Sequence, residues 1–136
     1  MLWQFPEEDP ALMAPLALAY VGDAVFELYI RSRLAAEGKK VNALHRRAVS
    51  FVSAQAMAGY YKAWEPHLTP AEAEVLHRGR NAKSRHRKSV GVGAYHLSTG
   101  FEALVGYLFL SRQEQRLAQL LALLPKDMED AQNEEC

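Results

Sequence analysis

The stretch LALAYVGDAVFELYI, from Leu16 to Ile30, decides the fold of this chain. Its apolar residues point in most directions around a helix, as expected for a helix that is buried in a core. Asp23 and Glu27 nevertheless lie within it, one helical turn apart on a shared face. An ionised carboxylate in such a place is costly unless it is paired, hydrogen-bonded or bound to a metal. The stretch therefore predicts a core helix whose acids need a specific partner.

A second apolar stretch, STGFEALVGYLFL from Ser98 to Leu110, repeats this pattern with Glu102. Two readings stay open for Asp23 and Glu102. Each acid could cap a helix or pair with a cation, or the two could face each other and hold a metal, as carboxylates do in helical bundles. Oxygen ligands alone favour magnesium or manganese. Gly22 costs about 1 kcal/mol relative to alanine inside a helix, so we expect something to approach the backbone closely there.

The composition limits the class of protein. With 136 residues, of which 49% are hydrophobic, the chain is expected to form one folded domain over 1–136. Its formal net charge is zero, so a polyanionic partner must be met by a local patch. The single cysteine, Cys136, argues against a disulfide framework and a cysteine-based zinc site. No signal peptide or membrane span is evident, so we expect a cytoplasmic protein.

Helical signals dominate the rest of the chain, and no strand-type alternation of useful length occurs. We therefore predict an all-α fold with about six helices. The first expected helix covers 10–36, is broken near Pro15 and is ended by Gly38, and the next two helices are capped by Asn42 and Ser53. A fourth helix is expected from a capping box at Thr69–Glu72 to about Gly79, and a fifth from about Tyr95 to Leu110. The last helix is expected from a capping box at Ser111–Glu114 through Leu124. The acidic end, about 127–136, is expected to fray.

The densest positive segment is RGRNAKSRHRK, from Arg78 to Lys88, and it is expected to be a loop. It could be a solvated loop or a clamp on the acidic end of the chain. It could also be an arm that contacts RNA phosphates across a groove of a duplex. The candidate RNA-binding residues are Arg78, Arg80, Asn81, Lys83, Arg85, Arg87 and Lys88.

Three motifs occur in a fixed order along the chain: LAYVGDA at Leu18–Ala24, RGRNAKS at Arg78–Ser84 and STGFEALVGYLF at Ser98–Phe109. In these motifs the chain resembles the ribonuclease III family. It is most similar to Mini-ribonuclease III, the short bacterial group without a double-stranded-RNA-binding domain. The resemblance covers almost the whole chain and implies the helical bundle of a ribonuclease III endonuclease domain.

The resemblance implies a magnesium-dependent endoribonuclease that cleaves double-stranded RNA, with manganese as a substitute. Asp23 and Glu102 would be its catalytic and metal-binding acids. Full-length members usually carry two further acids, at the positions where this chain has Ala19 and Thr99. The short group looks the same at these two positions, so their loss does not argue against activity.

The resemblance also implies a homodimer that matures a large-subunit (23S) ribosomal RNA precursor and leaves 5′-phosphate and 3′-hydroxyl ends. We expect Tyr20, Phe26 and Tyr29 to form part of the dimer interface. Whether a ribosomal-protein helper takes part stays open. The alternative function is a catalytically inactive ribonuclease III-like domain that binds structured RNA as a scaffold, although a scaffold has no reason to keep both Asp23 and Glu102.

Overall fold

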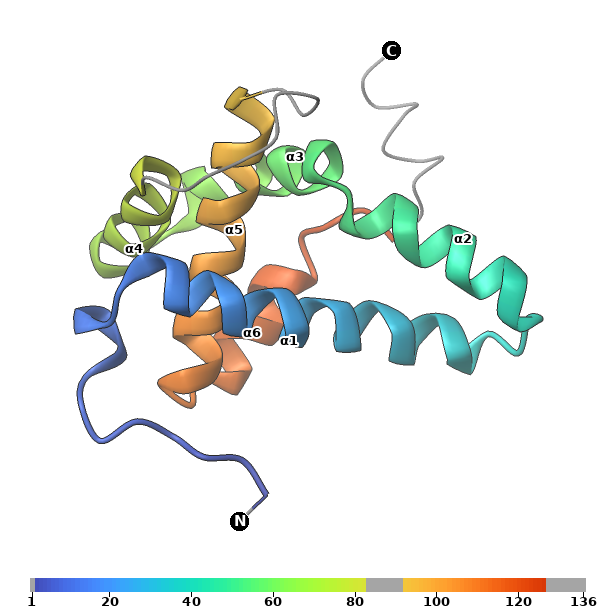
Figure 1. The fold of residues 1–136 in the computed structure, drawn as a ribbon, viewed down its shortest axis with the longest axis horizontal. Helices are drawn as coiled ribbons and strands as arrows, with labels where there is room; N and C mark the ends of the chain where they lie inside the picture. The colour runs from blue at the N-terminus through green and yellow to red at the C-terminus, as the bar shows by residue number, and fades with distance from the viewer. Residues whose placement is uncertain (1, 83–91, 127–136) are drawn as a thin grey trace.

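A computed structural model of the chain describes residues 2–82 and 92–126 (Figure 1). Its elements are η1 (Pro10–Leu12), α1 (Pro15–Ala36), α2 (Val41–Val52), α3 (Ala54–Trp64), η2 (Glu65–His67), α4 (Pro70–Asn81), α5 (Val92–Leu110) and α6 (Glu114–Leu121). No strand occurs in the described residues, so the prediction of an all-α fold with about six helices is confirmed. Within the same residues, no helix is long and apolar enough to cross a membrane. The predictions for 83–91 and 127–136 fall outside the described residues.

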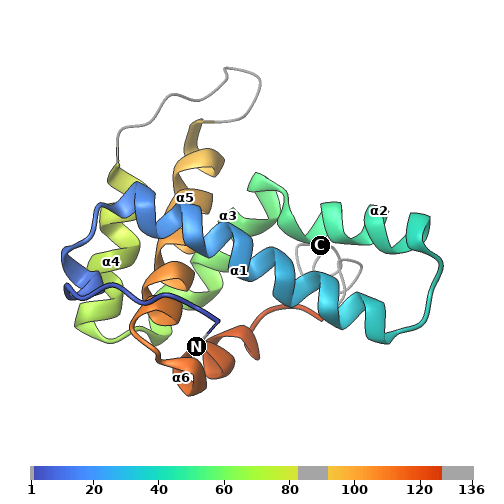
Figure 2. The same ribbon diagram turned by 60° about the horizontal axis from the view of Figure 1, so that its bottom comes forward.

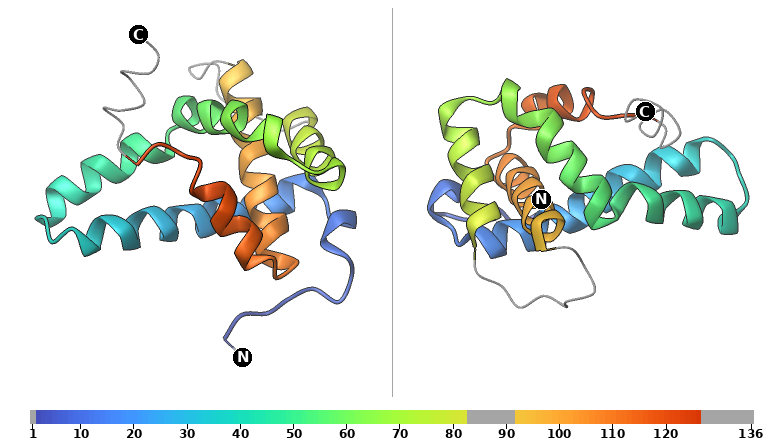
Figure 3. Two further views of the ribbon diagram at one scale, coloured as in Figure 1. Left: turned by 180° about the vertical axis from the view of Figure 1, so that it is seen from behind. Right: turned by 90° about the horizontal axis from the view of Figure 1, so that it is seen from above.

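Helix α5 is the centre of the packing. It descends through the bundle from the end where α4 stops, so the end of α4 and the start of α5 lie close to the same end of the molecule (Figure 2). Seen nearly end-on, α5 is surrounded by α1, α3, α4 and α6 (Figure 3, right). The side chains of α5 that are almost completely buried are Phe101, Ala103, Leu104, Val105 and Leu108. This burial explains why α5 is apolar on most of its sides.

An aromatic cluster joins α5 to α1 and α3. The ring of Phe101 lies 4.5 Å from that of Trp64 and 5.0 Å from that of Phe26, between ring centroids. The indole Nε1 of Trp64 also donates a hydrogen bond of 2.7 Å to the carbonyl of Leu120, which ties α3 to α6. Phe26 is only 1% exposed, so the prediction that it lies at a dimer interface is wrong. Its ring is needed in the core.

Most of the predicted helix boundaries are confirmed. The helical pattern over 10–36 does break before Pro15, and Gly38 follows α1 with a φ of 75°. The Ser53 hydroxyl accepts the Ala56 N–H at 3.1 Å and caps α3. Thr69 and Glu72 form the full capping box at the start of α4. These features depend on residues close together in sequence, which explains why they were predictable.

Two predicted caps are wrong. Lys40, and not Asn42, is the N-cap residue of α2. The segment from Ser111 does not form a capping box, because its N–H groups complete the end of α5. The Gln113 N–H bonds to the Leu108 carbonyl at 2.9 Å, and Arg112 adopts the left-handed conformation with a φ of 59°. This is a Schellman arrangement, and α6 consequently begins at Glu114 without a side-chain cap and ends at Leu121.

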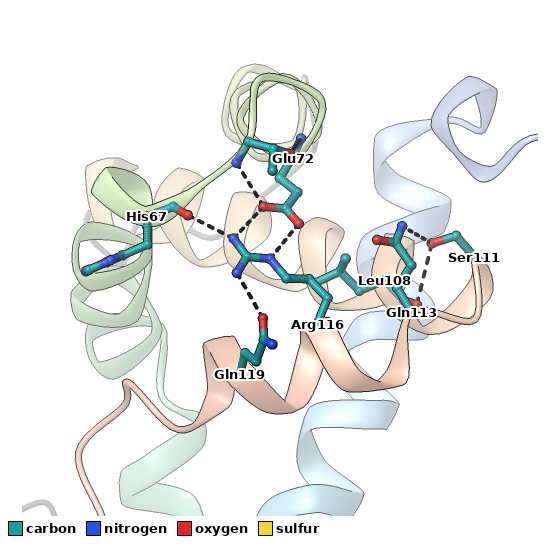
Figure 4. Close-up of polar contacts among 8 residues, drawn as sticks. His67, Glu72, Leu108, Ser111, Gln113, Arg116 and Gln119 are labelled. Atoms are coloured by element: carbon teal, nitrogen blue, oxygen red, sulfur yellow. Dashed lines mark hydrogen bonds and ion pairs between the residues drawn. The ribbon is translucent and has the colours of Figure 1, made fainter.

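A buried ion pair fastens α6 to the start of α4 (Figure 4). The Arg116 guanidinium donates to both carboxylate oxygens of Glu72, each at 2.9 Å, and to the His67 carbonyl at 2.8 Å. Glu72 is 4% exposed and also accepts the Thr69 N–H at 2.9 Å. The arginine hydrogen bonds lower the pKa of Glu72 more than burial raises it. The hydrogen bonds described here therefore all favour the ionised form of this carboxylate.

Candidate active site

The closest contact between α1 and α5 is made by two glycines. A Cβ atom on Gly22 would lie 1.8 Å from the carbonyl oxygen of Glu102, and one on Gly106 would lie 1.9 Å from the carbonyl oxygen of Leu18. No side chain fits at either position, so the two helix backbones touch. The prediction that Gly22 serves a close approach is confirmed, and the approaching group is the backbone of α5.

This crossing brings the two candidate acids together. Asp23 follows the contact glycine on α1, and Glu102 carries the carbonyl that Gly22 touches on α5. Their side chains are hydrogen-bonded to each other. The pKa of Glu102 is raised to about 9, mainly by burial and in addition by the hydrogen bond to Asp23 and its negative charge. The two acids therefore share one site, and Asp23 disfavours the ionised form of Glu102.

Asp23 and Glu27 of α1 differ in exposure, and the expectation that Asp23 is buried in a core helix is wrong. Asp23 is exposed at the surface of the bundle and is not buried within a core helix, because α1 is covered on only part of its circumference. Glu27, one turn further along α1, pairs with Arg31 at 2.9 Å, so it is a separate surface ion pair. Among the residues described, no arginine or lysine pairs with Asp23 or Glu102.

The two positions where full-length relatives carry further acids add no ligand here. Ala19 is buried. Thr99 is 6% exposed, and its hydroxyl donates a hydrogen bond of 3.0 Å to the Tyr95 carbonyl. In the ranges 2–82 and 92–126 no group of three or more histidine, cysteine, aspartate or glutamate side chains could hold a metal. Within the described residues, the candidate site therefore consists of two carboxylates.

Two carboxylates on different helices fit a hard divalent cation. Magnesium is usually bound through one or two carboxylates and keeps several of its waters. The pKa of Glu102 is raised by burial and by the neighbouring Asp23, and a cation between the two acids would offset both effects. The donor atoms are all oxygens, which is the set that magnesium and manganese prefer.

The candidate RNA-binding residues that the structure describes lie on α4 and not in a loop, because the helix continues two residues beyond Gly79. Both terminal nitrogens of Arg78 donate to backbone carbonyls, of Ala11 at 2.7 Å and of Met13 at 3.3 Å. Arg78 thus holds the N-terminal segment against α4. The remaining candidates, Lys83, Arg85, Arg87 and Lys88, lie outside the described residues.

Arg80 has a different environment. Its Nη1 donates to the Tyr61 hydroxyl at 3.1 Å, and its Nε donates to the side-chain oxygen of Asn81 at 3.1 Å. The last turn of α4 that carries these residues packs on α5 through a second pair of glycines. A Cβ atom on Gly79 would lie 2.7 Å from that of Ala103, and one on Gly100 would lie 2.7 Å from the Leu76 carbonyl oxygen.

Sequence reasoning missed two features of this region. Gly106 and Gly100 were not singled out, although their place inside an apolar helix was a signal of close packing similar to that of Gly22. The contact of Tyr61 with Arg80 was also missed. No local pattern could have revealed it, because the two residues are far apart in sequence and meet only after α3 and α4 pack on α5.

Comparisons with known proteins agree with this geometry. Residues 16–113 match the family model described as the ribonuclease III domain. The chain is 47% identical to the Mini-ribonuclease 3 of Symbiobacterium thermophilum, over 83% of this chain and 88% of that protein. It is 36% identical to the Mini-ribonuclease 3 of Clostridium tetani, over 97% and 89%. The fold is similar to the crystal structure of a Fusobacterium nucleatum protein, with a TM-score of 0.78 and 26% identity over 86% of this chain and 95% of the other.

The chain therefore belongs to the ribonuclease III family, and its relatives place it in the Mini-ribonuclease 3 group of that family. It is an endoribonuclease of the ribonuclease III type. The predictions of family, fold and enzyme class are confirmed, and the scaffold alternative loses its support.

Proposed function

We propose that this endoribonuclease cleaves double-stranded RNA with magnesium, or manganese in its place, held by Asp23 and Glu102. The observation that carries the proposal is the contact of these two carboxylates at a crossing where glycines bring two helix backbones together. The Glu72 carboxylate is satisfied by arginine, whereas these two are left to each other. Such an arrangement has no structural benefit and suits a site that is completed by a cation.

The two acids have different proposed tasks. Asp23 is exposed and can reach an ion that also contacts a bound phosphate. Glu102 is half-buried and anchored on the most deeply packed helix, so it fixes the position of the site. A bound divalent cation supplies Lewis-acid chemistry, which acidifies water and neutralises charge on the scissile phosphate. Attack of water on phosphorus with departure of the 3′ oxygen would leave the proposed 5′-phosphate and 3′-hydroxyl ends.

The surface of α1 supports a homodimer. Leu16, Tyr20, Ala24 and Leu28 recur every four residues and form one exposed apolar stripe, in which Tyr20 is 82% exposed. Asp23 borders this stripe. A two-fold contact along the stripe would bury it and place the two copies of Asp23 near a shared surface, as cutting both strands requires. This stripe replaces the interface predicted with Phe26, and Tyr20 remains its central aromatic residue.

The RNA substrate is the part of the proposal that depends most on relatives. We infer from the resemblance to Mini-ribonuclease III that the duplex is a stem of a large-subunit (23S) ribosomal RNA precursor, processed in the cytoplasm with or without a ribosomal-protein helper. The chain acts as one catalytic domain over 1–136. Arg80, Asn81 and the other basic candidates up to Lys88 would supply phosphate contacts, and Arg78 would assist from its place on α4.

The test compares cleavage of end-labelled double-stranded RNA by the native protein and by Asp23→Asn, in magnesium and in EDTA. The native protein should cut only with magnesium, and Asp23→Asn should cut about a thousandfold more slowly, since metal catalysis contributes several kcal/mol to the barrier. Glu27→Gln is the matched control, because it changes an acid one turn away that pairs only with Arg31. RNA that is bound but left uncut, including a ribosomal precursor stem, would contradict the proposal.

A further inference from the structure

A buried tyrosine of α3 connects two charged residues near the end of α4. Tyr61 is 2% exposed, and its hydroxyl accepts a hydrogen bond from Nη1 of Arg80 at 3.1 Å. The same hydroxyl is hydrogen-bonded to Glu65 of η2. Burial is the main cause that raises the pKa of Tyr61; Arg80 lowers this pKa, and Glu65 raises it further. A hydroxyl has one proton to donate, so the geometry makes Tyr61 the acceptor from Arg80 and the donor to Glu65.

Both ends of this chain of hydrogen bonds are held in place. The Glu65 carboxylate lies 2.7 Å from Nε2 of His77, which is on α4. At the other end, Nε of Arg80 donates to the Asn81 side chain at 3.1 Å. The guanidinium is therefore oriented by two neutral groups, a hydroxyl and an amide. These two bonds use two of the five N–H donors of an arginine, so the other N–H groups can donate to a further partner.

The charge of Arg80 distinguishes it from the other described arginines nearby. Arg116 is neutralised by Glu72, and both terminal nitrogens of Arg78 donate hydrogen bonds to backbone carbonyls. Among the residues that the structure describes, no carboxylate forms an ion pair with Arg80. A cation that is rigidly oriented and has no ion-pair partner among the described residues has the properties of a site for an external anion.

Arg80 and Tyr61 are also close to the helix that carries the catalytic acid. A Cβ atom on Gly100 would lie 2.9 Å from the Tyr61 ring and 3.2 Å from the Arg80 backbone nitrogen. Gly100 precedes Glu102 by two residues on α5, which is less than one helical turn. The position of the guanidinium is thus coupled through Gly100 to the helix of the active site.

We propose that Tyr61 is a positioning residue for RNA: its hydroxyl holds the Arg80 guanidinium in the orientation that binds a backbone phosphate of the duplex. The inference rests on the proposed function, because it assumes a double-stranded RNA substrate. An arginine that is already oriented loses less side-chain freedom when it binds, so each phosphate bond contributes more to affinity. Loss of the Tyr61 hydroxyl would leave the charge of Arg80 in place but release its orientation.

The experiment measures binding of a blunt RNA duplex by fluorescence anisotropy in EDTA, where no cleavage occurs, for Tyr61→Phe, Arg80→Ala and the double variant. Tyr61→Phe keeps the ring that packs on Gly100 and removes only the hydroxyl. We expect it to weaken binding about two- to tenfold, the usual effect of one hydrogen bond. Arg80→Ala should weaken binding at least as much, and the double variant should match Arg80→Ala, because the two changes act through one contact.

Two readouts separate positioning from a merely structural role. The slope of log affinity against log salt should fall by about one in Arg80→Ala, where the charge is removed, and by a smaller amount in Tyr61→Phe, where the charge stays but no longer holds the phosphate contact. In cleavage with magnesium, Tyr61→Phe should raise KM more than it lowers kcat. Tyr60→Phe is the matched control, since Tyr60 is a buried neighbour whose hydroxyl donates to the Phe51 carbonyl. It should lower thermal stability without changing the salt slope.

Each outcome has one meaning. If the native protein binds and cuts the duplex but Tyr61→Phe binds like the native protein, the positioning role is wrong. An additive double variant, or an unchanged salt slope in Tyr61→Phe, also overturns it. If the native protein neither binds nor cuts duplex RNA, the proposed function itself has failed, and this result is distinguishable because it appears before any substitution is made.

Discussion

Glu72 and Glu102 are two glutamates on helices of one bundle, but Glu72 lies beside the positive charge of Arg116 and Glu102 beside the negative charge of Asp23. Glu72 receives two hydrogen bonds from Arg116 and one from the Thr69 N–H, and its pKa is lowered. Glu102 is half-buried beside Asp23, and its pKa is raised to about 9. The first carboxylate is stabilised by its environment, and the second is destabilised by it.

The difference teaches how this fold separates stability from function. The α4–α6 contact is complete within the described chain, so removal of either partner leaves an unpaired charge. The α1–α5 contact is held by the glycine crossing and by apolar packing such as that of Phe26 on Phe101, and the acids placed there do not contribute to it. A site that costs stability is characteristic of a functional region, where the benefit comes from a ligand or a substrate.

The largest effect is expected where the crossing itself is broken. In Gly22→Ala the new methyl group would overlap the Glu102 carbonyl, so α1 must move away from α5. We expect the free energy of unfolding to fall by about 3 kcal/mol, at the upper end for overpacking, and cleavage to be lost. Denaturant unfolding measures the first effect. Gly59→Ala is the control: nothing lies within 4 Å of a Cβ there, so stability should stay equal or rise. Equal stability of the two variants would contradict the role of Gly22.

The next largest effect compares the two glutamates directly. Glu72→Gln should lower the free energy of unfolding by about 2 kcal/mol, because the charge-assisted bonds from Arg116 are weakened. Glu102→Gln should raise it by about 1 kcal/mol or more in EDTA at pH 8, since an amide can donate to Asp23 without the proton uptake that the native carboxyl needs at this pH. Both are measured by urea unfolding. If Glu102→Gln destabilised the fold as much as Glu72→Gln does, the surroundings of Glu102 would not be the opposite of those of Glu72, and the comparison would be wrong.

Measured per pH unit, the smallest effect is a pair of opposite slopes of stability against pH. The folded pKa of Glu72 lies below its ordinary value of 4.5, so its contribution is present above pH 4.5 and is lost as the pH falls through the folded pKa. The folded pKa of Glu102 is raised to about 9, so the folded state binds the extra proton and stability falls as the pH rises from 4.5 to 9. Each slope is at most about 1.4 kcal/mol per pH unit for one proton.

Urea unfolding in EDTA across pH 3 to 10 measures both slopes. The alkaline slope should disappear in Glu102→Gln, and the acid slope should shrink in Glu72→Gln. Persistence of the alkaline slope in Glu102→Gln would assign it to another group and contradict the cause given for the raised pKa.

Several parts of the site could be predicted from the sequence. Gly22 inside an apolar helix indicated a close backbone contact, and the structure confirms it. The Thr69–Glu72 box was predictable because its two residues are three apart and bond to each other's backbone. The second expected box, at Ser111–Glu114, had the same residue spacing, but the end of α5 uses those N–H groups. A local pattern shows which bonds a segment can make, and neighbouring elements decide which of them it does make.

The sequence by itself determined which segments are helical, which faces of them are apolar and that Asp23 and Glu102 lie on separate helices, because these properties follow from residues three or four positions apart. Only the tertiary structure decided that the two acids meet, that Asp23 is exposed, and that Arg78 holds the N-terminal segment while Arg80 rests on Tyr61. These contacts join residues distant in sequence. They depend on where α1, α3 and α4 cross α5, and the glycines at those crossings set how closely the helices approach.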